Sequence, residues 1–258
     1  MKHGICLISI AQMRSEQDHR SELVSQLLFG ETFDIIEKKN DWIKVRNTQD
    51  HYLGWVTTNQ VSMISESTFK EITKTPLIVC TQNFARVNCL NDNSFFTISA
   101  GSNFPGLHNK EFNIEKRRFF YFDEFEDTTN VSRELLPKFA KMFLDTTYLW
   151  GGRSCFGIDC SGLMQVVFKM AGISIHRDAS AQAANGMSID LLVEAQPGDL
   201  LFFDNQDQII THVGMLVEEG KIIHAFGKVR IDPVDHQGIF NKELKKYTHN
   251  LRLIKRMV

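Results

Sequence analysis

The chain carries the stretch Gly157-Ile158-Asp159-Cys160-Ser161-Gly162 a little beyond its midpoint. Asp159 is a favourable N-cap residue, so Cys160 is expected in the first turn of a helix that runs to about Ala171. The positive end of a helix lowers the pKa of a thiol and favours the thiolate, which is the nucleophilic form. Free cysteine is also among the most buried residue types, so a small buried side chain is the alternative interpretation of Cys160.

Two later segments, residues 211–217 and residues 221–225, look like the arms of a β-hairpin, and each contains a histidine. The residues between them, 218–220, end in a glycine. We therefore predict a three-residue loop in which Gly220 supplies the left-handed residue.

This loop fixes the register of the hairpin. Val217 would face Lys221 and Gly214 would face His224, which leaves room for the imidazole ring. His212 and His224 would then be diagonal neighbours on one face of the sheet, within side-chain reach of each other. A two-residue loop would instead place the two histidines on opposite faces, so the prediction depends on the register.

If the register is correct, the two histidines have different catalytic roles. His212 would take the proton from Cys160 and return it to the leaving amine. His224 would hold the His212 ring in the correct tautomer and stabilise its cation. No metal is expected, because no second cysteine lies at ligand spacing from Cys160 or His212, and Cys155 is interpreted as structural. The other histidines are interpreted as ordinary half-buried or surface residues: His3, His19, His51, His108, His176, His236 and His249.

Several separate segments of the C-terminal half agree in order and spacing with one known family. They are Tyr148-x-Trp150-Gly151-Gly152, Ser154-x-x-Gly157-x-Asp159-Cys160-Ser161-Gly162-Leu163, Arg177-Asp178, Pro197-Gly198-Asp199-Leu200-x-Phe202-Phe203, His212-Val213-Gly214 and His224-Ala225. These motifs resemble the NlpC/P60 family of papain-like cell-wall peptidases. The resemblance covers residues from about 130 to 258.

The resemblance implies roles for matched positions. Cys160, His212 and His224 match the family's catalytic residues. Tyr148 matches the tyrosine whose hydroxyl lies near the nucleophile and helps to hold the tetrahedral oxyanion together with the Cys160 backbone N–H. Core packing is the alternative for Tyr148. The remaining expected substrate contacts are Ser161 and Asp178, which match positions near the family's pocket, and Ser180, which is adjacent to a matched segment.

The N-terminal half has a residue pattern that favours strands. The first ten residues favour a β-strand over a signal peptide, and residues up to about 66 alternate short apolar runs with turn clusters. This pattern is typical of a small barrel of short antiparallel strands. Residues 67–125 are again rich in β-branched and aromatic side chains and are interpreted as a second β unit. Residues 123–130 are acidic and polar, as in a linker.

The C-terminal part begins with a helical pattern. Ser132 could cap a helix whose apolar face continues to Leu144. The helix from Cys160 follows, and then strands are predicted over residues 199–203, 212–217 and 221–226. Helices followed by antiparallel strands indicate the α+β class.

Motifs in the first 66 residues resemble a bacterial SH3-like domain. They are Met13-Arg14, Ser21-Glu22-Leu23-Val24-Ser25-Gln26, Phe29-Gly30-Glu31, Asp41-Trp42-x-Lys44-Val45 and Tyr52-x-Gly54-Trp55. Two such domains before a papain-like domain are the arrangement of γ-D-glutamyl-diamino acid endopeptidases. We therefore predict SH3-like domains over residues 1–66 and 67–125, and a catalytic domain over residues 126–258.

That subfamily cuts the bond between D-Glu and the diamino acid of murein peptides with a free N-terminal L-Ala. An ammonium group buried against carboxylates is bound strongly, whereas an acylated stem leaves the carboxylates unpaired. Asp159 and Glu22 are the candidate carboxylates, with Tyr52 packing over the alanine; the alternatives are a helix cap for Asp159 and a solvated charge for Glu22. Arg153 or Arg177 could meet a substrate carboxylate or be a solvated surface charge.

Net charge and cysteine content limit the partners and the compartment expected for this protein. A formal net charge of −2 over 258 residues gives no reason to expect nucleic acid or an acidic membrane as a partner. Five widely spaced cysteines fit reduced thiols and a cytoplasmic location. No cofactor is expected, and the expected partner is a small murein peptide. The competing functions are a non-catalytic wall- or peptide-binding SH3-like protein and a papain-like acyltransferase or amidase.

Overall fold

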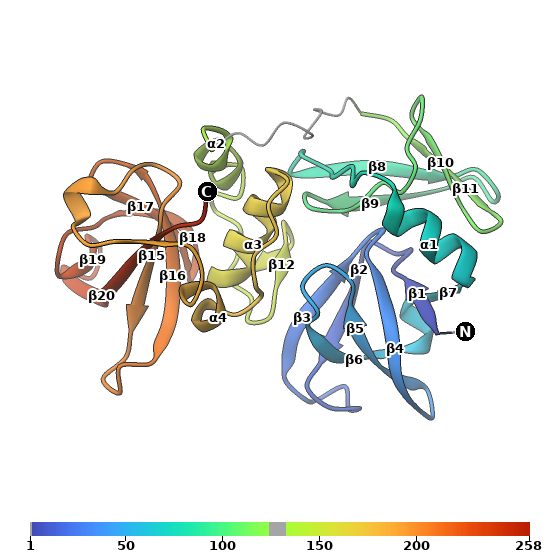
Figure 1. Ribbon diagram of the computed structural model, residues 1–258, viewed down its shortest axis with the longest axis horizontal. Helices are drawn as coiled ribbons and strands as arrows, with labels where there is room; N and C mark the ends of the chain where they lie inside the picture. The colour runs from blue at the N-terminus through green and yellow to red at the C-terminus, as the bar shows by residue number, and fades with distance from the viewer. Residues whose placement is uncertain (1, 124–132) are drawn as a thin grey trace. The chain divides into compact units, whose positions relative to one another are not determined.

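The computed structural model describes residues 2–123 and 133–258, and the chain divides into two compact units (Figure 1). The first comprises Met1–Asn130 together with Trp150–Cys155, and the second comprises Val131–Leu149 and Phe156–Val258. Helices and antiparallel sheets occur in separate stretches of the chain, which confirms the predicted α+β class. Ser132, the predicted helix cap, lies outside the described residues.

The first unit begins with a seven-stranded antiparallel sheet of order β3-β2-β6-β5-β4-β1-β7. Its strands are β1 (His3–Ile5), β2 (Ile10–Arg14), β3 (Leu23–Leu28), β4 (Thr32–Lys39), β5 (Trp42–Asn47), β6 (Leu53–Thr57) and β7 (Ser62–Ile64), with a short 3₁₀ helix η1 (Thr58–Gln60) before β7. Alternate residues are buried along β2 and β5, and their apolar side chains form one core with Phe33 and Val56.

A helix, α1 (Glu66–Lys74), opens the next part of the first unit, so the interpretation of this part as purely β is wrong. The Ser65 hydroxyl accepts a hydrogen bond from the Thr68 N–H, and Phe69 and Ile72 pack against the core that follows. This cap and the spacing of the two apolar residues outweigh the preference of Ile and Thr for strands.

A four-stranded sheet of order β10-β11-β8-β9 follows α1. Its strands are β8 (Phe84–Cys89), β9 (Ser94–Ser99), β10 (Glu111–Ile114) and β11 (Arg117–Tyr121). Phenylalanine rings fill its core, with Phe29, Phe112 and Phe119 in mutual ring contact. The division into two SH3-like domains at residue 66 stays a prediction.

The second unit combines helices with a second seven-stranded sheet, in which β14-β20-β15-β16-β17-β18 are neighbours in this order and β19 pairs with β20. Its helices are α2 (Leu135–Lys141), α3 (Cys160–Met170), α4 (Ala179–Ala183) and the 3₁₀ helix η2 (Leu192–Glu194). The strands are β14 (Met187–Ile189), β15 (Leu200–Asp204), β16 (Ile210–Glu218), β17 (Lys221–Phe226), β18 (Lys228–Pro233), β19 (Gly238–Asn241) and β20 (Lys246–Arg256). The short strands β12 (Arg153–Ser154) and β13 (Gly157–Ile158) precede α3.

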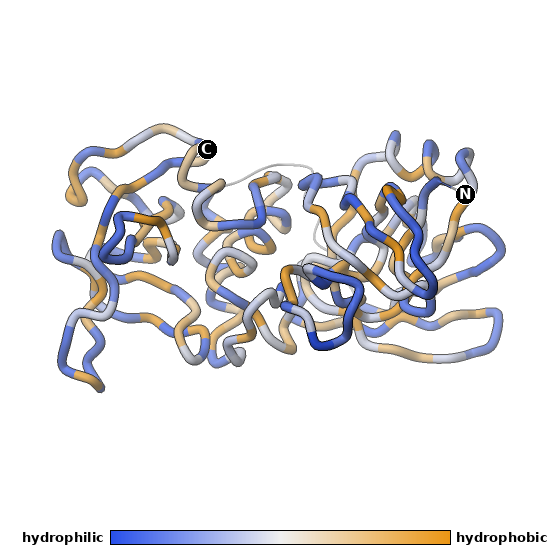
Figure 2. Tube along the Cα trace, turned by 90° about the horizontal axis from the view of Figure 1, so that it is seen from below, coloured by the Kyte–Doolittle hydropathy of each residue, from blue (hydrophilic) through white to orange (hydrophobic). Residues whose placement is uncertain are grey.

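Hydrophobic residues occur in short stretches between hydrophilic ones (Figure 2). Among residues 2–123 and 133–258, no helix combines the length and the apolar character needed to cross a bilayer. The helix predicted to reach Leu144 ends earlier, at Lys141, and Leu144 is exposed.

Candidate functional site

Cys160 occupies the first position of α3, as predicted. Asp159 has extended backbone angles and caps the helix, because its carboxylate accepts a 2.7 Å hydrogen bond from the Gly162 N–H. Every residue of α3 is buried, and Cys160 is 7% exposed. The helix ends where Gly172 adopts a positive φ of 77°.

Strands β16 and β17 form the predicted hairpin, but the turn differs from the prediction. Gly214 pairs with His224 as expected, whereas Lys221 pairs with Glu218 instead of Val217. The loop therefore has two residues, and Val217 is an extra, bulged residue in β16. This bulge shifts the register by one residue, so the histidines stay on the same face despite the shorter loop.

The pairing of Gly214 with His224 also explains why a glycine stands there. A Cβ atom at Gly214 would lie 2.9 Å from the His224 Cβ and 2.7 Å from the Ile222 Cδ1, closer than side-chain atoms approach. The missing side chain makes room for the imidazole of His224.

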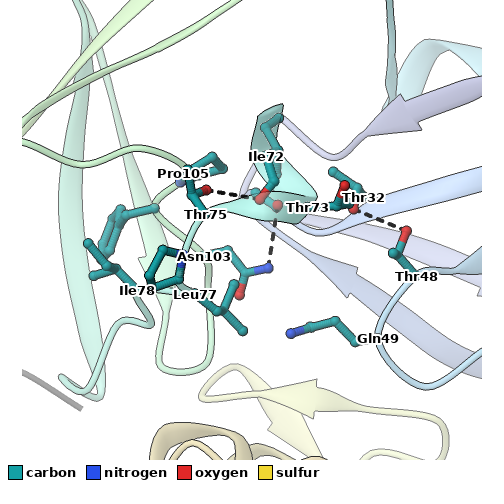
Figure 3. Close-up of a pocket in the computed structure, with 13 residues that line it drawn as sticks. Thr32, Thr48, Gln49, Ile72, Thr73, Thr75, Leu77, Ile78, Asn103 and Pro105 are labelled. Carbon is teal, nitrogen blue, oxygen red and sulfur yellow. Dashed lines mark hydrogen bonds between the residues drawn. The ribbon is translucent and has the colours of Figure 1, made fainter. Parts of the chain in front are cut away.

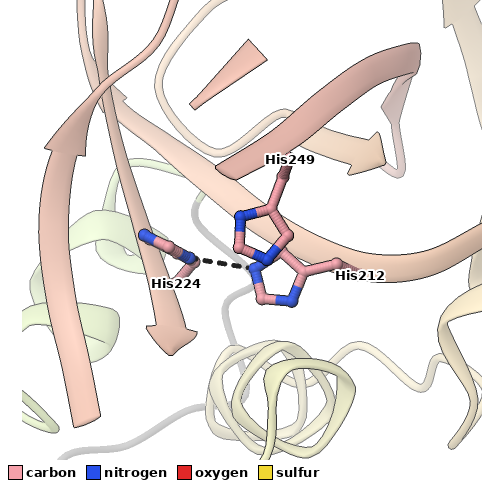
Figure 4. Close-up of side chains that lie close together, drawn as sticks. All are labelled: His212, His224 and His249. Carbon is pink, nitrogen blue, oxygen red and sulfur yellow. Dashed lines mark hydrogen bonds between the residues drawn. The ribbon is translucent and has the colours of Figure 1, made fainter. Parts of the chain in front are cut away.

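The two predicted histidines are joined by a hydrogen bond. His212 Nε2 and His224 Nδ1 are 2.9 Å apart, and the residues are 6% and 0% exposed (Figure 4). His249 of β20, interpreted from the sequence as an ordinary residue, stacks on His212 with ring centroids 4.1 Å apart. The His212 ring is thus held on two sides.

Burial sets the protonation of the site. It raises the pKa of the Cys160 thiol to about 12, assisted by the charge of Asp159, and it lowers the pKa of His212 well below 6.5. The backbone N–H groups of Ser161, in the first turn of α3, and of Val213, in β16, act in the opposite direction, but burial outweighs them. The prediction that the helix end favours a resting thiolate is therefore wrong, and both groups rest in their neutral forms.

Tyr148 lies near the thiol. Burial raises the pKa of its phenol to about 12, and the negative charges of Cys160 and Asp159 add to this increase. The Tyr148 backbone N–H donates to the Gly227 carbonyl, 3.0 Å away, which fixes the residue beside the turn between β17 and β18.

Comparisons with known proteins agree with these features. Residues 145–248 match the NlpC/P60 family, and residues 13–61 match the bacterial dipeptidyl-peptidase SH3 domain. The chain is 32% identical to a γ-D-glutamyl-L-lysine dipeptidyl-peptidase of Bacillus subtilis, over 78% of this chain and 71% of the relative. The chain belongs to the NlpC/P60 family. It is a cysteine peptidase with a strand-rich SH3-like region ahead of the NlpC/P60 domain.

Two further proteins are similar to this chain. A γ-D-glutamyl-L-lysine dipeptidyl-peptidase of Bacillus cereus is 29% identical, over 84% of this chain and 72% of the relative. The crystal structure of an NlpC/P60 family protein from Bacillus cereus has a TM-score of 0.83, with 20% identity, over 99% of both chains. The latter likeness shows that the two chains share a fold.

The hydrogen-bond chain of this NlpC/P60 domain extends beyond the predicted residues. His224 Nε2 lies 3.0 Å from Asp232 Oδ2, and Arg230 donates to both carboxylate oxygens of Asp232. Sequence reasoning missed both residues of β18. Continuing the hairpin register across Gly227 would have found them, because His224 pairs with Arg230 and Asp232 lies two residues further on the same face.

Asp159 has a partner that the sequence did not reveal. Arg177 donates to both of its carboxylate oxygens, at 3.0 and 2.5 Å, and also to the Ser161 hydroxyl at 2.9 Å. Arg177 is 3% exposed and is therefore not a solvated charge. Most of the charge of Asp159 is already compensated inside the domain.

The other predicted contacts are spread over both units. Asp178 precedes α4, and Ser180 is an exposed residue within it. In the first unit, Tyr52 packs against the barrel core, and the Glu22 carboxylate accepts a 2.6 Å hydrogen bond from the Trp150 indole N–H.

A metal could in principle bind the three histidines, since one ligand atom from each lies within 4.8 Å of the others. Their geometry argues against this. The rings of His212 and His249 are nearly parallel, at 24°, so their lone pairs do not converge, and both nitrogens of His224 already have partners. The expectation of a metal-free site stays a prediction.

A separate cavity of about 180 Å³ lies in the first unit, between α1 and the loops of both its sheets (Figure 3). Its lining is mainly apolar, with Ile72, Leu77 and Phe104, and the Asn103 amide reaches into it. It includes none of the predicted site residues.

Proposed function

We propose that this protein is a cysteine endopeptidase that cuts the γ-D-glutamyl–diamino acid bond of murein peptides with a free N-terminal L-Ala. Two features carry the proposal. A thiol stands at the start of α3, and two hydrogen-bonded histidines stand on β16 and β17, the strands that pack against α3. Cys160 would be the nucleophile, His212 the base, and His224 the group that orients His212.

The chemistry starts from a neutral pair. As the thiol attacks the scissile carbonyl, its proton passes to His212, and a tetrahedral oxyanion forms. The Cys160 backbone N–H and the Tyr148 hydroxyl would donate to this oxyanion. The His212 cation then gives its proton to the leaving amine, a thioester remains on Cys160, and water hydrolyses it.

The substrate class is supported by two relatives that are named γ-D-glutamyl-L-lysine dipeptidyl-peptidases. For the free amine of L-Ala we propose the Glu22 carboxylate, with Tyr52 against the methyl group. Glu22 has one strong donor, Trp150, and a carboxylate can accept further hydrogen bonds. Asp159 is the weaker of the two candidates, because Arg177 already occupies both of its oxygens.

Polar groups at the start of α3 and at α4 would complete the pocket. We propose Ser161, Asp178 and Ser180 as further contacts to the peptide. Ser161 is held between Asp159 and Arg177, so its position is well defined. A small peptide would be the only partner that catalysis needs.

We also propose that the protein acts in the cytoplasm, on wall peptides that have already been released. All five cysteines are free thiols, as a reducing compartment would keep them. Cell fractionation with an antibody against the protein would test the location.

The deciding experiment is a digest followed by mass spectrometry. The substrates are L-Ala-γ-D-Glu-diaminopimelate, its L-lysine analogue and an N-acetylated copy of each, and Cys160→Ala is the control. We expect release of the free diamino acid from the two free-amine peptides only, and none with Cys160→Ala.

Other outcomes point to other functions. Equal cutting of the acetylated peptides would refute the amine-binding roles of Glu22 and Asp159 while leaving the Cys160 chemistry intact. Transfer of the dipeptide to an added amine in preference to water would indicate an acyltransferase. Binding without cutting, unchanged in Cys160→Ala, would indicate a non-catalytic peptide-binding protein.

A further inference from the structure

The buried carboxylate of Asp232 is hydrogen-bonded to His224, the second residue of the histidine pair. Asp232 Oδ2 is 3.0 Å from His224 Nε2 and 2.6 Å from Arg230 Nε, and Oδ1 is 3.0 Å from Arg230 Nη2. Asp232 is 3% exposed. Burial by itself would raise its pKa, but hydrogen bonds from His224 and Arg230 outweigh burial and hold the pKa below its usual value. Asp232 is therefore ionised at neutral pH.

An ionised carboxylate only accepts hydrogen bonds, so His224 must carry a proton on Nε2. Burial lowers the pKa of His224, despite the opposing effect of Asp232, so the ring is neutral and its Nδ1 has a lone pair. The 2.9 Å contact then requires that His212 donates from Nε2. The lone pair of His212 is left on Nδ1, the nitrogen that is free to act as a base.

We propose that Asp232 is a positioning residue that fixes the tautomers of both histidines and thereby leaves His212 Nδ1 as the base for Cys160. The proposal rests on the function proposed above, since it takes Cys160 as nucleophile and His212 as base. Asp232 does not touch the thiol. It acts through His224.

Removal of Asp232 would favour the wrong tautomer. The guanidinium of Arg230 would then be the group nearest to His224 Nε2, and a guanidinium only donates. His224 would keep its lone pair at Nε2 and donate from Nδ1 to His212 Nε2. His212 would carry its proton on Nδ1 and could no longer take the proton of Cys160.

The titratable and charged groups around the pair come from three elements. Arg230 and Asp232 face it from β18, His249 from β20, and Cys160 from α3, while the pair itself spans β16 and β17. The pKa of His249 is lowered to about 4, chiefly by burial, so His249 is neutral above pH 5. Asp232 and Arg230 keep their charges at neutral pH.

The test compares Asp232→Ala with Asp232→Asn and with a control, Glu243→Gln. The Asn oxygen can still accept from His224, so Asn should retain more activity than Ala. Loss of a carboxylate that orients a metal-binding histidine typically costs about 10- to 100-fold, and we expect a fall of the same order in kcat of Asp232→Ala, with KM within about threefold. Glu243 is an exposed residue that accepts a 3.3 Å hydrogen bond from Arg230 Nη1, and its replacement should leave kcat within about twofold.

Two further readouts do not depend on the peptide substrate. Nitrogen-15 NMR of labelled histidines should show the His212 proton on Nε2 in the native protein and on Nδ1 in Asp232→Ala. Alkylation of Cys160 by iodoacetamide at pH 8 should slow in the same variant and much less in Asp232→Asn. Both measurements use the intact chain.

The outcomes separate the two proposals. If no murein peptide is cut but the tautomer and the alkylation rate change as described, the proposed substrate fails and the role of Asp232 stands. If Asp232→Ala keeps the His212 proton on Nε2 and its kcat stays within twofold of native, the role of Asp232 is refuted. A drop in kcat with unchanged tautomers would show that Asp232 is merely structural.

Discussion

Arg153 forms a buried ion pair whose contribution to stability can be measured. Its guanidinium donates to both carboxylate oxygens of Glu31, at 3.0 and 3.1 Å, and to the Gln26 carbonyl at 2.6 Å. The side chains of Arg153 and Glu31 are 2% and 0% exposed. Arg153 is therefore neither a solvated charge nor free to meet a substrate carboxylate, the two alternatives that its sequence left open.

Replacing Arg153 with Met leaves the Glu31 charge buried without its partner. Breaking such a pair costs about 3–5 kcal/mol. All three tryptophans, Trp42, Trp55 and Trp150, belong to the first unit, so their fluorescence reports the unfolding of that unit. With a urea slope of about 2 kcal/mol per molar, the unfolding midpoint should fall by about 1.5–2.5 M.

A double-mutant cycle isolates the pair. Glu31→Gln keeps an oxygen for the Leu28 N–H, and Arg153→Met with Glu31→Gln should cost about 2 kcal/mol less than the sum of the two single changes. Lys70→Met, in an exposed pair of the same unit, is the control and should shift stability by less than about 1 kcal/mol. Additive single effects, or an Arg153→Met midpoint equal to that of the control, would refute the reasoning.

Two further changes probe the second unit. Gly214→Ala would place a Cβ 2.9 Å from the His224 Cβ and displace the ring that orients His212; because a misplacement of about 1 Å can cost 100-fold, kcat should fall by about 10- to 100-fold, and overpacking should cost about 1–3 kcal/mol of stability. Asp199 is fully buried; burial alone would raise its pKa, but hydrogen bonds from Arg256 and Arg133 lower it. Its stabilisation is present above the unfolded pKa of about 3.9 and is lost as pH falls through the lower folded value. Asp199→Asn should therefore cost about 1.5–3 kcal/mol in urea unfolding at pH 7, and the cost should decrease as the pH falls below about 3.9; a cost that does not change with pH would contradict this assignment.

The helix start at Cys160 and the meeting of His212 and His224 could be predicted because their signals are local. An N-cap residue directly before Cys160 fixes the start of α3, and a glycine in the turn marks the hairpin that brings His212 and His224 together. The loop length was predicted wrongly, since no residue type in the segment 211–225 indicates the bulge at Val217. The histidines still meet because a shorter loop and one extra residue cancel in the register.

The partners of the centre could not be predicted, since they come from distant positions. His249 reaches His212 only through the order of strands in the sheet, and Arg177 reaches Asp159 across 18 residues. A buried arginine and a solvated arginine look alike in a sequence. Helix α1 could not be predicted for a different reason. Its β-branched residues favour a strand, and the hydrogen bond from the Thr68 N–H to the Ser65 hydroxyl is evident only in the structure.

Because Cys160 and His212 are both neutral at rest, proton transfer between them has to be stabilised by other groups. Burial raises the pKa of the Cys160 thiol to about 12 and lowers the pKa of the His212 imidazole well below 6.5, so moving the proton from Cys160 to His212 is unfavourable before the new charges attract each other. The attraction between the thiolate and the imidazolium recovers part of this cost. The remaining deficit has to be met as the carbon–sulfur bond forms, when the negative charge moves from sulfur to the oxyanion and its donors. In the proposed mechanism, the His212 cation would be stabilised through His224 by the ionised Asp232, so the buried carboxylate would matter most when the proton is transferred.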